Sequence, residues 1–121
     1  MEQFEHGPFR REAVGVAADQ LHQALRDDSP YVRSIAAQAL GQYGSEAEAG
    51  EALKVLIELA PLDKNGVYTS MTALNAIDAM DGRAASAKAA IGALPREDSS
   101  VGRRLRAYVP NLIKKILADL D

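Results

Sequence analysis

The sequence LHQALRDDSPYVRSIAAQALGQYG, from Leu21 to Gly44, has the pattern of two antiparallel helices joined by a polar turn. Apolar residues recur on both sides of the turn at three- and four-residue spacings, which places them on one face of each helix. Ser29 is suited to cap the second helix, and Pro30 suits its first position, where the missing N–H is not needed. The stripe predicted to face the core of the second helix comprises Val32, Ile35, Ala36, Ala39, Leu40 and Tyr43, with Arg33, Ser34, Gln38 and Gln42 on the other side.

The same apolar pattern returns at a constant offset of 37 residues. The matched pairs are Ala36 and Ala73, Ala39 and Ala76, Leu40 and Ile77, and Tyr43 and Met80. A fainter third copy places Leu25, Leu59 and Leu94 each before a polar turn. Periods of about 35 to 45 residues are typical of helix-pair repeats. We therefore expect an all-α fold, a right-handed α-α superhelix in which about three helix pairs form a short solenoid.

A chain of 121 residues is expected to form one domain, 1–121. The repeats divide it into an N-terminal arm at 1–10, repeat 1 at 11–44, repeat 2 at 45–81 and repeat 3 at 82–121. Helices are predicted at about 11–27, 30–43, 46–60, 66–80, 84–94 and 100–120. No alternating β-branched run predicts a strand.

Capping residues mark several of these helix ends. Ser45 and Glu48 form a capping box, in which each side chain satisfies the backbone amide of the other residue. Asn65 and Ser99 are the expected caps of later helices. Pro110 lies inside the last apolar pattern, so the final helix is expected to kink or break near Tyr108, or to restart with Pro110 in its first turn.

The charge is unevenly distributed. The formal net charge of −3 argues against general nucleic-acid binding, which needs a basic surface. A basic stretch near the C-terminus nevertheless contains five cations and no acid: Arg103, Arg104, Arg106, Lys114 and Lys115. Either these side chains form an ordinary solvated face, or they form a patch that binds phosphate, a polyanion or an acidic partner.

Composition also excludes several kinds of site. The chain has no cysteine, so disulfides, zinc thiolates and thiol nucleophiles are excluded, although the compartment stays open. No stretch approaches the ~20 apolar residues of a membrane span. The N-terminus lacks the basic and apolar regions of a signal peptide, so a soluble, unexported chain is expected.

The sequence offers no catalytic, cofactor or metal site. His22 and Asp19 lie three residues apart, but two ligands rarely hold a metal, and His22 is expected to be a half-exposed helix residue. Asp27 and Asp28 are adjacent in the turn, where carboxylates usually accept backbone donors. Ser29 has no nearby histidine to activate it.

The remaining candidates for function lie on the second helix of each repeat. A polar ridge that binds a partner is predicted to comprise Arg33, Gln38, Ser70, Asn75 and Arg104, with ordinary solvent exposure as the alternative. Tyr31 and Tyr68, at the starts of two of these helices, are either anchors for a partner or residues that pack against the preceding helix.

The turn and the helix after it resemble the HEAT repeat, specifically the short HEAT-like variety also found in bilin lyases. The residues that carry the resemblance are Leu21, Leu25, Asp28, Pro30, Val32, Arg33, Ala36, Ala37, Ala39 and Leu40. It implies that Asp28 and Arg33 link neighbouring repeats. Later copies depart from the pattern, because Tyr68 replaces a second arginine and Gly102 precedes Arg103.

A narrower resemblance connects 21–44, TALNAIDAM at 72–80 and RAYVPNLIKKILADL at 106–120 to the helical C-terminal tail of certain bacterial sulfatases. The catalytic signature of that family, Cys or Ser followed by x-Pro-x-Arg, is absent. In the nearest run, from Ser29 to Arg33, the proline is one place early and the arginine one place late. The resemblance implies a non-catalytic accessory domain, exported with its enzyme.

These observations favour a non-catalytic interaction or structural module, monomeric or weakly dimeric, with a protein partner and no cofactor. The partner implied by the second resemblance is a sulfatase-like catalytic domain. The alternatives are a lyase-type enzyme subunit and a phosphate- or polyanion-binding module that uses the basic C-terminal helix.

Overall fold

The computed structural model describes residues 18–121, and every regular element within that range is helical. The elements are α3 (Ala18–Ala24), α4 (Pro30–Tyr43), α5 (Glu46–Leu59), α6 (Leu62–Asn65), α7 (Val67–Ala79), the 3-10 helix η1 (Asp81–Ala87), α8 (Lys88–Gly92), the 3-10 helix η2 (Arg103–Leu105) and α9 (Tyr108–Leu120). The predicted all-α class is confirmed. The arm at 1–10 and the first part of the helix predicted at 11–27 lie outside the described residues.

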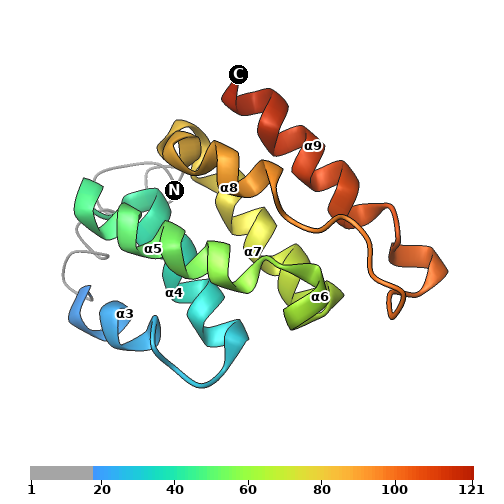
Figure 1. Cartoon of the computed structure of the whole chain (residues 1–121). Helices are drawn as coiled ribbons and strands as arrows, with labels where there is room; N and C mark the ends of the chain where they lie inside the picture. Colours follow the sequence, from blue (N-terminus) through green and yellow to red (C-terminus); the bar gives the residue numbers. More distant parts are fainter. Residues whose placement is uncertain (1–17) are drawn as a thin grey trace, which may run out of the picture.

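The helices form two layers (Figure 1). In one layer α4, α7 and α9 run in the same direction, and α7 packs against both of the others. In the other layer α5 packs across α4 and α7, while η1 and α8 pack against α9. Antiparallel pairs stacked in this way bury a continuous core between neighbouring repeats.

Aliphatic side chains fill the space between the layers. Those with no exposed surface include Leu40, Leu56, Leu74, Ile77, Ile91 and Ile113. Between them lie buried alanines such as Ala36, Ala52 and Ala76, whose small side chains allow the helices to approach closely. Gly41 also marks a close approach, because an added Cβ would lie 2.8 Å from the Cγ of Met80.

The strongest start signals are confirmed. Ser29 caps α4 by accepting the backbone N–H of Val32, and Pro30 occupies the first helical position. Both bonds of the capping box at Ser45 and Glu48 are present. The last helical segment breaks as expected, because α9 starts at Tyr108 and holds Pro110 in its first turn.

Two predicted caps are wrong. The Asn65 side chain donates instead to the carbonyl oxygens of Glu58 and Pro61, closing the short helix α6 that the sequence did not predict. Gly66, with φ 84°, then begins α7 without a side-chain cap. Ser99 starts no helix, because Asp98 accepts the backbone N–H of Ser100 and holds this segment in a turn.

The helices predicted at 84–94 and 100–120 are also divided differently. The first consists of η1 followed by the short α8, and the second consists of η2 and α9. In both segments the spacing of apolar residues does not distinguish a 3-10 turn from an α-helical one.

Candidate interaction surface

The exposed sides of α4, α7 and α9 form equivalent stripes. On α4 the stripe is Tyr31, Ile35 and Gln38, at positions i, i+4 and i+7, which lie on one helix face. The same spacing recurs on the other two helices, giving Tyr68, Thr72 and Asn75 on α7, and Tyr108, Leu112 and Lys115 on α9. Because the three helices lie side by side in the same direction, these nine residues form one surface, here termed the α4–α7–α9 face.

A row of tyrosines lies at the N-terminal end of this face. Tyr31, Tyr68 and Tyr108 are 67%, 72% and 54% exposed, and their hydroxyl groups have no hydrogen-bond partner among the described residues. The alternative in which Tyr31 and Tyr68 pack against the preceding helix is therefore wrong. Ile35 adds a further apolar side chain that is 49% exposed. Large exposed side chains gathered on one surface are typical of interaction sites.

Of the five residues predicted for the polar ridge, three are exposed on or beside the α4–α7–α9 face and two are not. Gln38 and Asn75 are exposed on the α4–α7–α9 face, and Arg104 is exposed beside it. The prediction that Ser70 belongs to the ridge is wrong, because Ser70 is buried in the core, where its hydroxyl has no partner among the described residues. Ser70 follows Tyr68 by two residues, about 200° around the helix, so it points away from the exposed stripe.

The Arg33 side chain is held by two contacts within the protein. Its Nε donates to the carbonyl oxygen of Leu25 at 3.0 Å, and its Nη2 lies 3.0 Å from Glu58 Oε2. Arg33 thereby ties α4 to the residue that follows α3 and to α5. The link implied by the HEAT resemblance is present at Arg33, but Asp28 is exposed and is not its partner.

A groove of about 400 Å³ opens between α7 and the start of α9. Its lining residues come from both helices and from the segment before α9: Asn75, Arg104, Ala107, Tyr108, Asn111, Leu112 and Lys115. The groove therefore contains Asn75 from the predicted ridge, Lys115 from the predicted basic patch, and Arg104, which belongs to both predicted sets. No carboxylate lines it.

The five cations of the basic patch do not form one surface. Lys115 lies at the groove, 2.9 Å from Asp78 and 3.0 Å from Asp119, and hydrogen bonds to Asp78 and then Asp119 raise its pKa. Arg106 lines a different pocket, and its Nε donates to the carbonyl oxygen of Val101. Arg103 and Lys114 are exposed and line neither cavity.

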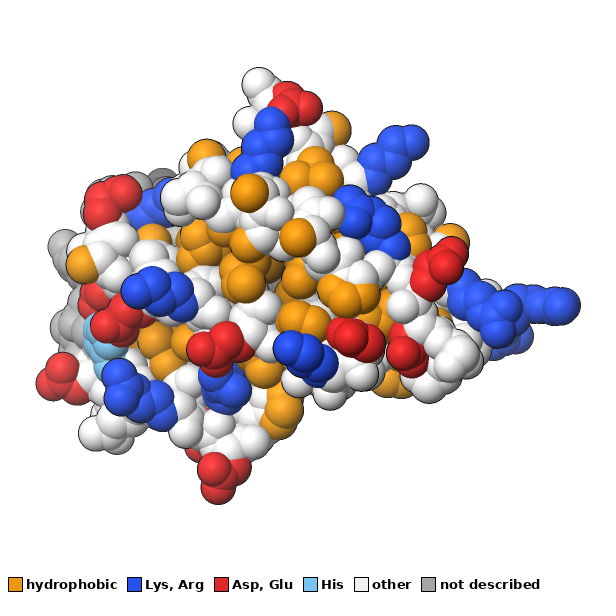
Figure 2. All heavy atoms as spheres, viewed as in Figure 1, with side chains coloured by type: hydrophobic (Ala, Val, Ile, Leu, Met, Phe, Trp, Pro, Cys, Tyr) orange, Lys and Arg blue, Asp and Glu red, His pale blue; other side chains and the backbone are white. Residues whose placement is uncertain are grey.

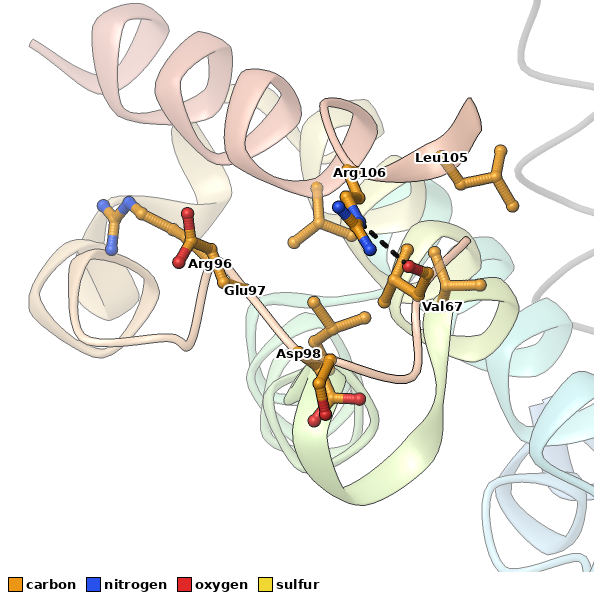
Figure 3. Close-up of a pocket in the computed structure, with 10 residues that line it drawn as sticks. Val67, Arg96, Glu97, Asp98, Leu105 and Arg106 are labelled. Carbon is orange, nitrogen blue, oxygen red and sulfur yellow. Dashed lines mark hydrogen bonds between the residues drawn. The ribbon is translucent and has the colours of Figure 1, made fainter. Parts of the chain in front are cut away.

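The second pocket has a volume of about 460 Å³ and lies where the loop after α8 crosses α6 and the starts of α7 and α9. Arg106 Nε donates to the carbonyl oxygen of Val101, and Figure 3 marks this bond with a dashed line and shows Arg96 farther away, after α8. Arg96 is held by the carbonyl oxygens of Gly92 and Leu94. The polar groups of this pocket thus serve mainly to hold its own loop.

His22 bridges α3 and α5. Its Nε2 lies 3.2 Å from Glu48 and its Nδ1 lies 3.2 Å from Glu51, while its side chain is 38% exposed, as expected for a half-exposed residue. The partners are on α5, so the pairing with Asp19 considered from the sequence is not the one observed. Within residues 18–121, no group of three or more His, Asp or Glu side chains is arranged to hold a metal ion.

The opposite layer has a different surface. Figure 2 shows acidic and basic side chains mixed around apolar ones, with no broad area of a single charge, on the side where α5 and α8 lie. None of the helices within the described range has both the length and the apolar character of a membrane span.

The stacked helix pairs, the repeated exposed stripe and the alanine-rich core define an all-α protein of the helix-pair repeat class. Residues 17–109 match the family described as HEAT repeats, and the chain belongs to that family. No curated protein and no solved structure gives a significant match.

Proposed function

We propose that this HEAT-repeat chain is a non-catalytic interaction module that binds a partner protein on its α4–α7–α9 face. The observation that carries the proposal is the row formed by Tyr31, Tyr68 and Tyr108, each exposed at the start of its helix. Tyrosine is enriched among the residues that dominate binding energy, because it buries a large rigid area and offers a hydroxyl group. A single exposed tyrosine would be unremarkable, whereas three at equivalent positions form a continuous surface.

The polar residues of the same face support this proposal. Gln38 and Asn75 follow the tyrosines by seven residues on α4 and α7, and both are exposed. Their amides provide hydrogen-bond donors and acceptors next to the apolar row. An apolar centre bordered by polar groups is the usual composition of a protein interface.

The test is a triple variant with Tyr31→Ser, Tyr68→Ser and Tyr108→Ser, produced as a tagged protein in the native host. Because the three rings are exposed, the melting temperature should change little. Recovery of the partner should fall by about tenfold or more, as expected for the loss of dominant interface residues. A matched control replaces three exposed residues of the other layer, with Ala47→Ser, Lys54→Ser and Ala89→Ser. Equal recovery with both variants would refute the proposed face.

Two finer parts of the proposal rest on the sequence. The repeat boundaries at 44/45 and 81/82 follow from the 37-residue offset, and the partner domain follows from the resemblance to sulfatase tails. The second part is tested by sequencing the natural coding DNA upstream of Met1. An in-frame sulfatase signature would support an accessory domain, and an in-frame stop codon would contradict it.

A further inference from the structure

We infer that the groove between α7 and α9 binds an acidic side chain of an extended segment of the partner, with Arg104 as its counter-ion. This inference rests on the proposed function and specifies the chemistry of the partner at one end of the α4–α7–α9 face. It depends on three features of the groove: the unpaired guanidinium of Arg104, the two free amide groups and the apolar lining residues.

Arg104, one of the two cations that line the groove, has no counter-ion among the described residues. This side chain is exposed and forms no hydrogen bond or ion pair with any described residue, unlike Arg33 and Arg83, which bond to carbonyl and carboxylate oxygens. Lys115, the other cation in the groove, already donates to Asp78 and Asp119. A carboxylate entering the groove would therefore pair with Arg104, and such bidentate pairs are strong for exposed groups.

The start of α9 contributes to the same field. The helix has 13 residues, and no side chain caps its first amides. The N-terminal end of a helix carries a partial positive charge that favours an anion within its first turn. Both Ala107 and Tyr108, at this helix start, line the groove with Arg104.

Two amide side chains lie on opposite walls. Asn75 comes from α7 and Asn111 from α9, both are exposed, and neither forms a hydrogen bond with another described residue. An extended peptide exposes backbone N–H and C=O groups at regular intervals, and an asparagine amide can pair with both. The amides therefore favour an extended segment over a compact one.

Three of the residues that line the groove are apolar or aromatic. Leu112 is half-buried, and Ala107 and Tyr108 are exposed. They suit an aliphatic side chain two residues from the acidic one, because in an extended segment residues i and i+2 point to the same side. The expected segment is thus extended, with an acidic and an aliphatic residue two positions apart.

The experiment uses the full chain, labelled with nitrogen-15, and an acetylated and amidated decapeptide, Glu-Ser-Leu-Ser-Glu-Ser-Leu-Ser-Glu-Ser, in which Glu and Leu lie two positions apart and so share a face when extended. We expect amide shifts concentrated at Asn75, Arg104, Asn111 and Lys115. Arg104→Gln should weaken binding by about tenfold, because it removes a charge-assisted hydrogen bond. The matched control is Arg26→Gln, an exposed arginine in the turn before α4, which should leave affinity unchanged.

Two further probes separate the possible outcomes. The same decapeptide with Gln in place of each Glu should bind at least about tenfold more weakly than the acidic one, since it lacks the charge. Equal affinity for both, together with no effect of Arg104→Gln, would overturn the acidic specificity and leave the interaction face intact. Tighter binding of a thymidine decanucleotide in the groove would assign the site to phosphate and also overturn the inference.

Absence of any shift in the groove at millimolar peptide would overturn the groove as a site. That result would not decide the proposed function, because Tyr31 and Tyr68, two of the three tyrosines in the triple variant, do not line the groove. Conversely, groove binding that is lost in Arg104→Gln would stand even if partner recovery did not depend on the tyrosines.

Discussion

At the scale of single residues, polar side chains that bond to other parts of the chain differ from polar side chains that are only exposed. Arg33 and Gln38 were grouped in one ridge by their sequence offsets, yet they have different environments. The guanidinium of Arg33 is engaged by Leu25 and Glu58, whereas Gln38 is exposed. Side chains five positions apart on a helix point about 140° away from each other, and periodicity alone does not say which direction is covered.

This difference predicts unequal effects of alanine substitution. Arg33→Ala leaves the Leu25 carbonyl without its side-chain donor and should lower the free energy of unfolding by about 1 to 2 kcal/mol. The ion pair with Glu58 adds little, because that carboxylate is 68% exposed. Gln38→Ala should change stability by less than about 0.5 kcal/mol. Urea denaturation of both variants measures the difference, and equal values would mean that Arg33 has no structural role.

Ser34 and Ile35 show the same limit of prediction. Ile35 was expected in the core and is 49% exposed, while Ser34 was expected outside and is 1% exposed. Ser34 tolerates burial because its hydroxyl donates to the Pro30 carbonyl. α4 contacts α3, α5 and α7, so most of its circumference is covered, and a rule based on a single apolar stripe fails.

At the scale of helices, local signals specified the ends of α4 and α5 well. Ser29 with Pro30, and Ser45 with Glu48, satisfy backbone donors by side chains within three residues, so neither depends on the tertiary fold. The break before Tyr108 was predictable for the same reason, from Pro110. Asn65 was misassigned because its amide bonds to Glu58 and Pro61, contacts made only after α5 has ended.

The capping box predicts a specific pH dependence. The pKa of Glu48 lies below its ordinary value of 4.5, first because its carboxylate accepts the Ser45 backbone N–H and then because it bonds to His22. A carboxyl group with a lowered pKa stabilises the fold above its unfolded pKa, and that contribution is lost as the pH falls through the folded pKa. Stability should therefore decline below about pH 4.5 more steeply in the native chain than in Glu48→Gln.

The measurement is denaturant unfolding at a series of pH values from neutral to about 3. Ser45→Ala is the matched control, because it removes the side-chain cap but retains the backbone N–H that Glu48 accepts. It should lower stability by about 1 kcal/mol at neutral pH and keep the acid dependence. Identical pH profiles for the native chain and Glu48→Gln would contradict the assignment.

The contact between α4 and α7 gives a second prediction at this scale. A Cβ at Gly41 would lie 2.8 Å from Cγ and 2.9 Å from Sδ of Met80, which is itself only 3% exposed. Gly41→Ala should cost about 1 to 2 kcal/mol through overpacking. In a Met80→Ala background the same change should be neutral or stabilise by up to about 1 kcal/mol, because alanine favours the helix. A double-mutant cycle measured by thermal unfolding tests this, and additive effects would exclude the close contact.

At the scale of the whole molecule, the sequence was sufficient for the class of fold but not for the binding surface. The 37-residue offset predicted the stacking of α4 on α7, because equivalent apolar positions such as Leu40 and Ile77 are both fully buried. The offset from α7 to α9 is 40 residues, from Tyr68 to Tyr108, so the third member of the tyrosine row was not found by a constant period. The groove could not be predicted from the sequence either, because it forms only where η2 places Arg104 beside Asn75 in the fold.

The central claim is that the α4–α7–α9 face, rather than the layer of α5 and α8, contacts the partner. The most direct test places a photoreactive benzoylphenylalanine at Tyr68 in one protein and at Lys54, exposed on α5, in another, and irradiates both in the native host. We expect a specific cross-linked protein from position 68 and none from position 54. The same cross-linked protein from both positions with equal yield, or from position 54 alone, would contradict the proposed face.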